Sequence, residues 1–418
     1  MARVRSIRDV VDHRLCIGCG ACVHVLGQGA ARMVDIPDKG LRPKLLRPLS
    51  AEEDRKALAV CPGLTVNAGA PEASVADPAA GRALRVWAGY AADSEIRFHG
   101  SSGGVLTALS SYCLEHGKAD FVAHTGMDSH SPWKNRSTVS RNRAELLQQA
   151  GSRYAPSSPC DLFSTIESSS GKAVFIGKPC DIAALRLTER RKPHFSERIA
   201  AVLTFFCAGT PSSQSVYELA REALGDDADQ ISRLKFRGEG WPGEFRVSLN
   251  GNGGRSLYSY ETSWGRLQAT RGLRCQLCAD GMGELADVSC GDAWHRYNGD
   301  GNPGLSIVVA RTQRGLDLVE EAIERGYLIL DEVEPAEIAA SQGSDSGIAN
   351  RRRATWGRLL VLRLLGIPRP QYVGFPLFSA WRQLPLRKKA KSVVGTVVRV
   401  FRKRLYTRDY SHPGSGVR

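Results

Sequence analysis

Short runs of apolar and β-branched residues recur along the middle of the chain. Runs of this length and composition are typical of buried strands, and they occur at 86–91, 121–124, 173–177, 201–206 and 305–310. The segments between them have apolar residues at helical spacing and predict helices, among them 104–115 and 212–224. This alternation predicts a mixed α/β fold, in which helices cover a sheet.

The end of the chain has a different pattern, with apolar stretches at 356–365 and 384–405. In the second stretch one apolar stripe recurs at helical spacing: Leu386, Ala390, Val393, Val394, Val397, Val398, Phe401 and Leu405. Basic residues fill most of the remainder: Arg387, Lys388, Lys389, Lys391, Arg399, Arg402, Lys403 and Arg404. The pattern predicts a basic amphipathic helix.

Charge is distributed very unevenly along the 418 residues, whose formal net charge is +14. Residues 351–418 contain 17 Lys or Arg and one acidic residue, Asp409, so their local charge is +16 and the first 350 residues sum to −2. Because the body is nearly neutral, nucleic-acid binding is disfavoured. For residues 384–405 we expect peripheral contact with an anionic membrane surface; the alternatives are docking on the body or a partner, or a partly disordered arm.

The N-terminal residues Met-Ala-Arg-Val-Arg-Ser-Ile-Arg lack the apolar run of a signal peptide, and no window approaches the roughly 20 apolar residues of a membrane-spanning helix. The 11 cysteines are therefore expected to be reduced thiols rather than disulfides. We expect a cytoplasmic protein, with the basic tail contacting the inner face of the membrane.

Four cysteines near the N-terminus have a recognisable spacing. Cys16, Cys19 and Cys22 form C-x-x-C-x-x-C, and Cys61 precedes a proline. This is the ligand pattern of a ferredoxin-type 4Fe-4S cluster, because short turns let three thiolates converge and a distant cysteine completes the set. A zinc site or unligated core cysteines are the alternatives, although zinc sites usually pair two C-x-x-C units.

Further cysteines follow predicted strands or form a second C-x-x-C. The best placed are Cys180, Cys207, Cys275 and Cys278, with Cys290 as a fifth candidate. Such a set can supply four thiolates to a second cluster, but free cysteines are often only small buried apolar residues. We interpret Cys113 and Cys160 in that second way.

A loop of small residues, Ser101, Ser102, Gly103 and Gly104, leads directly into a predicted helix. Backbone N–H groups at a helix N-terminus bind phosphate, so a dinucleotide such as FAD would fit. A loop with an ordinary N-cap is the alternative.

Several separated segments together resemble a known family. They are Ser101–Gly104, Lys-Pro-Cys-Asp-Ile at 178–182, Phe-Phe-Cys-Ala-Gly-Thr-Pro-Ser at 205–212, Phe-Arg-Gly-Glu-Gly-Trp-Pro-Gly at 236–243, the second C-x-x-C, and Ala-Asp-Val-Ser-Cys-Gly-Asp-Ala-Trp at 286–294. In this order, and over residues 16–310, they resemble the coenzyme F-420 hydrogenase/dehydrogenase beta-subunit family, which also contains hydroxymethyl-chlorophyll reductases.

The resemblance implies an enzyme with FAD and one or two 4Fe-4S clusters. It assigns one cluster to Cys16, Cys19, Cys22 and Cys61. It assigns the second to Cys180, Cys207, Cys275 and Cys278, with Cys290 at a position where the family typically has a non-ligand residue. Lys178 and Trp241 would lie near the flavin together with the Ser101–Gly104 loop.

We therefore expect a ferredoxin-like cluster unit at 1–75, a flavin and iron–sulfur domain with a mixed sheet at 84–345, and a basic helical tail at 346–418. Residues 69–81 read as a linker. His99 and His295 are the nearest candidates for a proton donor, although a lone histidine is more often a surface or structural residue. Arg237 and Trp241 are candidate contacts for an anionic or planar substrate, although an arginine on a turn is usually solvated.

The sequence is compatible with three functions. The first is an oxidoreductase that passes electrons between a ferredoxin-type redox protein and a small molecule at FAD, with a coenzyme F-420 type deazaflavin as one option. The second is a non-catalytic electron-transfer subunit, and the third is a zinc-stabilised binding module.

Overall fold

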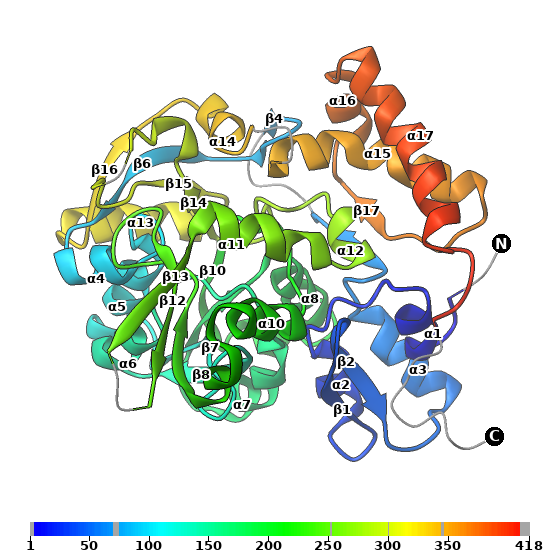
Figure 1. The fold of residues 1–418 in the computed structure, drawn as a ribbon, viewed down its shortest axis with the longest axis horizontal. Helices are drawn as coiled ribbons and strands as arrows, with labels where there is room; N and C mark the ends of the chain where they lie inside the picture. Colours follow the sequence, from blue (N-terminus) through cyan, green and yellow to red (C-terminus); the bar gives the residue numbers. More distant parts are fainter. Residues whose placement is uncertain (1–3, 70–74, 251–252, 300, 344–346, 410–418) are drawn as a thin grey trace.

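The computed structural model describes residues 4–69, 75–250, 253–299, 301–343 and 347–409. Within these residues, an eight-stranded sheet has the order β16-β6-β15-β14-β10-β9-β7-β8 (Figure 1). Its strands are β6 (Arg85–Ala91), β7 (Phe121–Met127), β8 (Asn135–Ser140), β9 (Ala173–Gly177), β10 (Ile199–Phe205), β14 (Val288–Asp292), β15 (Ser306–Ala310) and β16 (Leu328–Glu332). The mixed α/β class and the five predicted strands are confirmed.

The middle of this sheet is parallel and its margins are antiparallel. Strands β14, β10, β9 and β7 run parallel to one another, whereas β15, β6 and β16 on one side and β8 on the other are antiparallel to their neighbours. The carboxyl ends of parallel strands meet at one edge of a sheet, where ligands commonly bind. Cys207 follows β10 at this edge, and Lys178 follows β9.

The two faces of the sheet bury different partners, because successive side chains of a strand point to opposite faces. Phe175 and Val202 pack on one face with α8 (Pro179–Glu189) and part of the N-terminal unit. On the other face Val174 and Leu203 pack against four further helices. These are α4 (Ser94–His99), α5 (Val105–Glu115), α6 (Arg143–Gln148) and α13 (Gln313–Glu324).

A smaller antiparallel sheet has its own core. It consists of β11 (Ile231–Lys235), β12 (Glu244–Leu249) and β13 (Gly254–Ser259), flanked by α10 (Ser213–Leu224) and α11 (Tyr260–Leu267). Phe236, Phe245 and Leu219 are among the residues buried between these elements. The predicted helices at 104–115 and 212–224 correspond to α5 and α10 and are confirmed.

The N-terminal cysteines belong to a small unit built from short elements. These are α1 (Ile7–Asp12), α2 (Ala21–Leu26), β1 (Ala31–Ile36), β2 (Gly40–Leu45), α3 (Ala51–Ala59) and β3 (Thr65–Asn67). Strands β1 and β2 form an antiparallel hairpin in which Ile36 pairs with Gly40. The expected linker contains the short pair β4 (Val75–Asp77) and β5 (Gly81–Arg82), while residues 70–74 lie outside the described part of the chain.

The C-terminal residues contact both the N-terminal unit and the domain of the large sheet. They form α15 (Ile348–Leu364), β17 (Gln371–Val373), α16 (Leu377–Arg382) and α17 (Leu386–Arg402), and β17 pairs parallel with β3 (Figure 1). Arg14 donates a hydrogen bond to the Thr407 carbonyl at 3.3 Å, and Lys39 pairs with Asp409 at 2.8 Å. The predicted helix at 384–405 is present as α17, and the domain limits at 75, 84 and 346 stay predictions.

Shorter helices connect the main elements. They include α6 (Arg143–Gln148), α7 (Phe163–Ser168), α9 (Pro193–Ser196), α12 (Leu273–Gln276) and α14 (Ala336–Ser341). Among the described helices, none has the length and apolarity needed to cross a bilayer.

Arg352 on α15 is the fully buried charge that fixes the C-terminal segment to the sheet domain. Its guanidinium forms an ion pair with buried Glu284 and donates to the carbonyls of Pro78 at 2.6 Å and Ala279 at 3.2 Å. Burial alone would raise the pKa of Glu284, but Arg352 offsets this effect and the pKa is lowered. Removing Arg352 would therefore leave a buried carboxylate without its main partner.

We expect Arg352→Ala to lower the free energy of unfolding by about 3–5 kcal/mol, the usual effect of leaving a buried charge uncompensated. The matched control is Arg353→Ala, because the neighbouring Arg353 makes only a 3.4 Å hydrogen bond to Gln383 near the surface. The control should change stability by less than about 0.5 kcal/mol. Thermal unfolding of the three proteins measures the difference, and equal midpoints for both variants would contradict it.

Candidate functional site

The four N-terminal cysteines lie in one group, in which Cys16 is half-buried and the other three are buried. Cys16 follows α1, Cys19 and Cys22 bracket the start of α2, and Cys61 follows α3. Burial raises the pKa of the Cys61 thiol to about 12, and the nearby thiols of Cys19 and Cys16 contribute to the rise. The pKa of Cys22 is raised by burial and then by the other three members of the set. The structure therefore brings these four sulfurs together.

Two glycines explain how the chain turns within this short motif. Gly18 has φ +75° and Gly20 has φ +92°, in the left-handed region that favours glycine. A Cβ atom on Gly18 would lie 2.6 Å from the Leu41 carbonyl oxygen, and one on Gly20 would collide with the Asp161 carboxylate. Only glycine fits either position.

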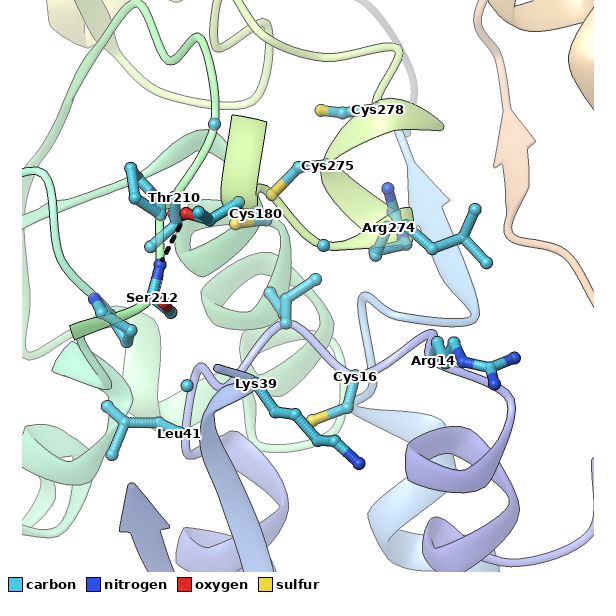
Figure 2. Close-up of a pocket in the computed structure, with 18 of the residues that line it drawn as sticks. Arg14, Cys16, Lys39, Leu41, Cys180, Thr210, Ser212, Arg274, Cys275 and Cys278 are labelled. Atoms are coloured by element: carbon cyan, nitrogen blue, oxygen red, sulfur yellow. Dashed lines mark hydrogen bonds between the residues drawn. The ribbon is translucent and has the colours of Figure 1, made fainter. Parts of the chain in front are cut away.

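The second set of cysteines lines a cavity of about 210 Å³ between the N-terminal unit and the sheet domain. Cys180 lies in the first turn of α8, Cys207 follows β10, and Cys275 and Cys278 lie in and after α12. Burial raises the pKa of Cys207 to about 12, with a further contribution from Cys275. Figure 2 shows Cys180, Cys275 and Cys278 on one side of this cavity and Cys16 on the other. Both cysteine sets thus reach the same cavity.

Two guanidinium groups lie beside these thiols. Arg274 is buried and donates to the carbonyls of Pro62 at 2.9 Å and Gly63 at 3.3 Å, directly after Cys61. Arg351 donates to the Cys207 carbonyl at 2.6 Å. Burial raises the pKa of Cys278, while Arg351 and Arg274 oppose that effect. The positive charges therefore favour the thiolate form that metal binding requires.

Across the described ranges, no three metal-ligating side chains converge closely enough to hold a single ion. Around one zinc ion the sulfurs would all lie about 2.3 Å from the same centre. A 4Fe-4S cluster spreads its thiolates over four irons, so its ligands lie further apart. The described residues thus contain no ready single-ion site, and the choice of a cluster over zinc stays a prediction from the cysteine spacing in the sequence.

A second cavity, of about 280 Å³, lies at the carboxyl edge of the parallel strands. The Ser101–Gly104 loop contributes Ser101, Ser102 and Gly104, and the first turn of α5 also lines it. Cys207, Gly209 and Thr210 line both this cavity and the cysteine cavity. The segment after β10 is therefore a shared wall.

The glycine-rich loop is held by β15. Gly103 N–H donates to Ser306 Oγ at 2.9 Å, and Ser102 Oγ donates to the Leu305 carbonyl at 2.8 Å. A Cβ atom on Gly103 would lie 2.6 Å from the Gly89 carbonyl oxygen on β6, so this glycine is required for packing. Helix α5 begins at Val105 without a side-chain cap. Its free first-turn N–H groups, rather than that of Gly103, are available to an anion at the cavity.

Lys178 lines the second cavity, but its ammonium group is already occupied. It lies 2.7 Å from Asp181 Oδ2 and donates to Ser157 Oγ at 2.7 Å and to the Ser157 carbonyl at 3.1 Å. Burial alone would lower the pKa of Lys178, but Asp181 more than offsets this effect and the pKa is raised. Lys178 remains charged and fixes the start of α8.

The structure places Trp241 behind the cavity rather than among its lining residues. Trp241 Nε1 donates to Asp292 Oδ1 at 2.8 Å, and its ring stacks against Trp294 at 5.5 Å. Arg237 does line the cavity and is buried, in contrast to the solvated position that is usual for an arginine on a turn. It makes two hydrogen bonds to Asp292, at 2.6 and 3.0 Å.

Tyr260, Trp264 and Trp294 form an aromatic wall of the second cavity, which was not recognised from the sequence. Tyr260 stacks on Trp294 with ring centroids 5.3 Å apart, and the Arg237 guanidinium lies 4.6 Å from the Tyr260 ring. Trp264 also lines this side, and the four-residue spacing of Tyr260 and Trp264 in an otherwise polar helix was the available signal. The wall presents flat apolar surfaces and one buried ion pair.

The two candidate histidines lie away from the second cavity. His99 and His295 do not line the second cavity, and His295 instead pairs with Glu337 at 2.8 Å. His124 does line it, and its Nε2 lies 2.8 Å from Ser140 Oγ. Burial lowers the pKa of His124 to about 4, so this residue is neutral at pH 7. Neither candidate histidine lines the second cavity, in line with the surface or structural role that is usual for a lone histidine.

Three cysteines lie outside the two sets. Cys290 is buried on β14 and lines the second cavity, not the one reached by Cys180. Cys113 is buried on α5. Cys160 is fully buried, and its N–H donates to the Cys19 carbonyl at 3.2 Å, so it lies beside the first set although its spacing gave no sign of this.

Known proteins resemble this chain over much of its length. Two family models match, describing the two ends of the "Coenzyme F420 hydrogenase/dehydrogenase, beta subunit": the N-terminal one over residues 86–163 and the C-terminal one over 171–336. A coenzyme F420-dependent sulfite reductase from Methanocaldococcus jannaschii is 26% identical over 348 residues, which are 79% of this chain. The match covers 49% of that protein, so the chain spans about half of its length.

Shorter relatives match over most of their length. The coenzyme F420 hydrogenase subunit beta of Methanosarcina barkeri is 24% identical over 271 residues, covering 62% of this chain and 87% of that protein. A solved chain of the F420-reducing [NiFe] hydrogenase complex from the same organism has a similar fold, with a TM-score of 0.56 and 20% identity over 72% of this chain and 99% of that chain. The chain belongs to the coenzyme F420 hydrogenase/dehydrogenase beta-subunit family.

Proposed function

We propose that the protein is an FAD-dependent iron–sulfur oxidoreductase that transfers electrons between 4Fe-4S clusters and a small molecule at FAD. The observation that carries the proposal is the shared wall at Cys207, Gly209 and Thr210, which separates the cysteine cavity from the second cavity. A redox centre on each side of this wall would be close enough to exchange electrons. The family supports oxidoreductase chemistry of this kind.

The cysteine sets supply the ligands in this proposal. Cys16, Cys19, Cys22 and Cys61 would hold one cluster, and Cys180, Cys207, Cys275 and Cys278 the other. Cys290 is not a ligand in this proposal, since it lines the other cavity. Arg274 and Arg351 would offset part of the buried negative charge of the thiolates.

FAD is proposed for the second cavity. The uncapped N-terminus of α5 would receive the pyrophosphate, because its N–H groups and the helix dipole favour an anion. Arg153 adds positive charge at this cavity; its guanidinium donates only to neutral oxygens, and burial lowers its pKa to about 9. The residues present therefore fit a dinucleotide with a charged phosphate group.

Bound FAD would supply the ability to exchange hydride with a small molecule and single electrons with iron–sulfur centres. The chain's own residues prepare the cavity for it. Arg237 and Asp292 neutralise each other, so the aromatic wall excludes water without a net charge. Burial raises the pKa of Tyr260, which keeps its proton, and His124 stays neutral. These groups keep constant charge across physiological pH.

The proposed electron partner is a ferredoxin or another redox protein, and the proposed compartment is the reducing cytoplasm. Figure 2 shows Cys16 across the cavity from Cys180, Cys275 and Cys278, and we propose that electrons enter or leave on the Cys16 side. Relatives are named for coenzyme F420, which makes a deazaflavin of that type our candidate small molecule. The aromatic wall suits such a planar ring system.

A non-catalytic electron-transfer subunit is the alternative. It is favoured by the likeness to a chain of a hydrogenase complex, where separate chains work together. The two functions differ in one measurement. Only an oxidoreductase with its own substrate site oxidises or reduces a small molecule without a partner chain.

We expect the anaerobically reconstituted protein to contain about eight irons per chain, and Cys19→Ser or Cys278→Ser to contain about four, since each variant loses one cluster. Cys113→Ser and Cys290→Ser are matched controls, because both replace buried cysteines outside the two sets. They should retain about eight irons. Iron and zinc analysis gives the answer; about four irons in the parent protein, or zinc in place of iron, would refute the cluster assignment.

The phosphate position is tested by Thr107→Asp, in the first turn of α5. A carboxylate there favours the helix by about 0.3–1 kcal/mol but repels a bound phosphate. We expect FAD affinity to fall by at least about tenfold, equivalent to about 1.4 kcal/mol. The nearly isosteric Thr107→Val should bind FAD within about threefold of the parent protein. If Thr107→Asp binds FAD normally in a fluorescence titration, the pyrophosphate lies elsewhere.

A further inference from the structure

Helix α17 packs on α15 through a face of mostly small polar residues, not through the apolar stripe recognised in the sequence. The buried residues at i, i+4 and i+8 are Ser392, Thr396 and Val400, not the long apolar stripe. Close approach depends on Gly357 of α15, where a Cβ atom would lie 2.5 Å from Ser392 Oγ. Val400 joins a small apolar cluster with Leu362 of α15.

Most of the apolar stripe is therefore left at the surface. The exposed fractions are 82% for Leu386, 59% for Val394, 56% for Val398 and 59% for Phe401. Ala390, between them, is also exposed. We call these five residues the outer face of α17. Figure 1 shows α17 at the margin of the molecule, away from the large sheet.

Exposed basic residues border the outer face along its length. Arg387, Lys391 and Arg402 are exposed, and Arg382 and Lys403 lie near the two ends of the helix. The acidic residue of this segment, Asp409, is engaged with Lys39 and Arg14 of the N-terminal unit. The surface is thus an apolar face with a positive border.

We propose that the outer face of α17 lies on an anionic lipid surface. Apolar side chains would enter the boundary between headgroups and acyl chains, while the basic border contacts the headgroups. The helix has 17 residues, so it can lie flat along the interface over about 25 Å. The opposite face stays docked on α15, which holds the redox domain at the surface.

A second copy of the chain fits this face less well. A twofold interface places the same patch on both partners, so the basic borders of two copies would meet. The segment 351–418 has a net charge of +16 and only one acidic residue to offset such repulsion. An anionic lipid surface, in contrast, supplies the complementary charge.

The test is co-flotation of the full-length protein with vesicles of about 30% phosphatidylglycerol in phosphatidylcholine, with pure phosphatidylcholine vesicles in parallel. We expect binding to the anionic vesicles, weaker binding to the neutral ones, and loss at high salt. Replacing Arg387, Lys391 and Arg402 by Gln should weaken binding on the order of 100-fold, since each basic residue near the surface contributes roughly fivefold. The matched control replaces the exposed Arg233 and Arg255 of the small sheet by Gln and should leave binding unchanged.

The apolar contribution is tested by the triple variant Val394→Ser, Val398→Ser and Phe401→Ser. We expect at least about a tenfold loss of vesicle binding, because three exposed apolar side chains are removed. Ile329→Ser, at a 50% exposed position on β16, is the control and should bind normally. Flavin and iron content and the thermal midpoint, measured on every variant, show that folding and the redox sites are intact.

Several outcomes would overturn the lipid proposal while leaving the proposed redox function untouched. They are absence of full-length protein from the anionic vesicle fraction, equal binding to neutral vesicles, and normal binding by the triple serine variant. A dimer in light scattering that the same variant dissociates, without vesicle binding, would show that a second copy covers the outer face.

Discussion

Arg274 is the contact on which the relative placement of the two cysteine sets depends. Its buried guanidinium joins the loop after Cys61 to the C-x-x-C loop that contains its own neighbour Cys275, and it also donates to Tyr372 Oη at 2.7 Å. Tyr372 in turn donates to the Leu277 carbonyl at 2.8 Å. A single cation thus connects the N-terminal unit, the sheet domain and β17. Because it lies among thiols, it would also balance the negative charge of these groups in the thiolate form.

The sheet then determines what lies next to the cysteines. Parallel strands end at a common edge, so the segment after β10 separates the cysteine cavity from the one at α5. The same edge receives the aromatic wall from the small antiparallel sheet and α11. The order of the sites along the molecule follows from this topology: first cysteine set, second cysteine set, second cavity.

Much of the fold was predictable because apolar periodicity directly reflects burial in a sheet. The strands at 173–177 and 201–206 were recognised because they are buried on both faces, whereas β8, which is polar and at the sheet margin, was not. Cysteine spacing identified the metal-ligand candidates, since local turns fix which thiols can converge. The aromatic wall was missed because Arg237, Tyr260 and Asp292 are brought together only by tertiary structure. The outer face of α17 was predicted as a stripe, but its docking through Ser392 and Thr396 was not, because small polar residues carry no apolar signal.

We propose that the two cysteine sets and the second cavity form one continuous electron path. Electron paramagnetic resonance of the fully reduced, reconstituted protein tests it most directly, because two paramagnetic clusters at close range broaden or split each other's signals. The arrangement predicts an interaction spectrum in the parent protein and simple, uncoupled spectra in variants that lack a ligand of either set. A parent spectrum equal to the sum of the two single-cluster spectra would contradict it.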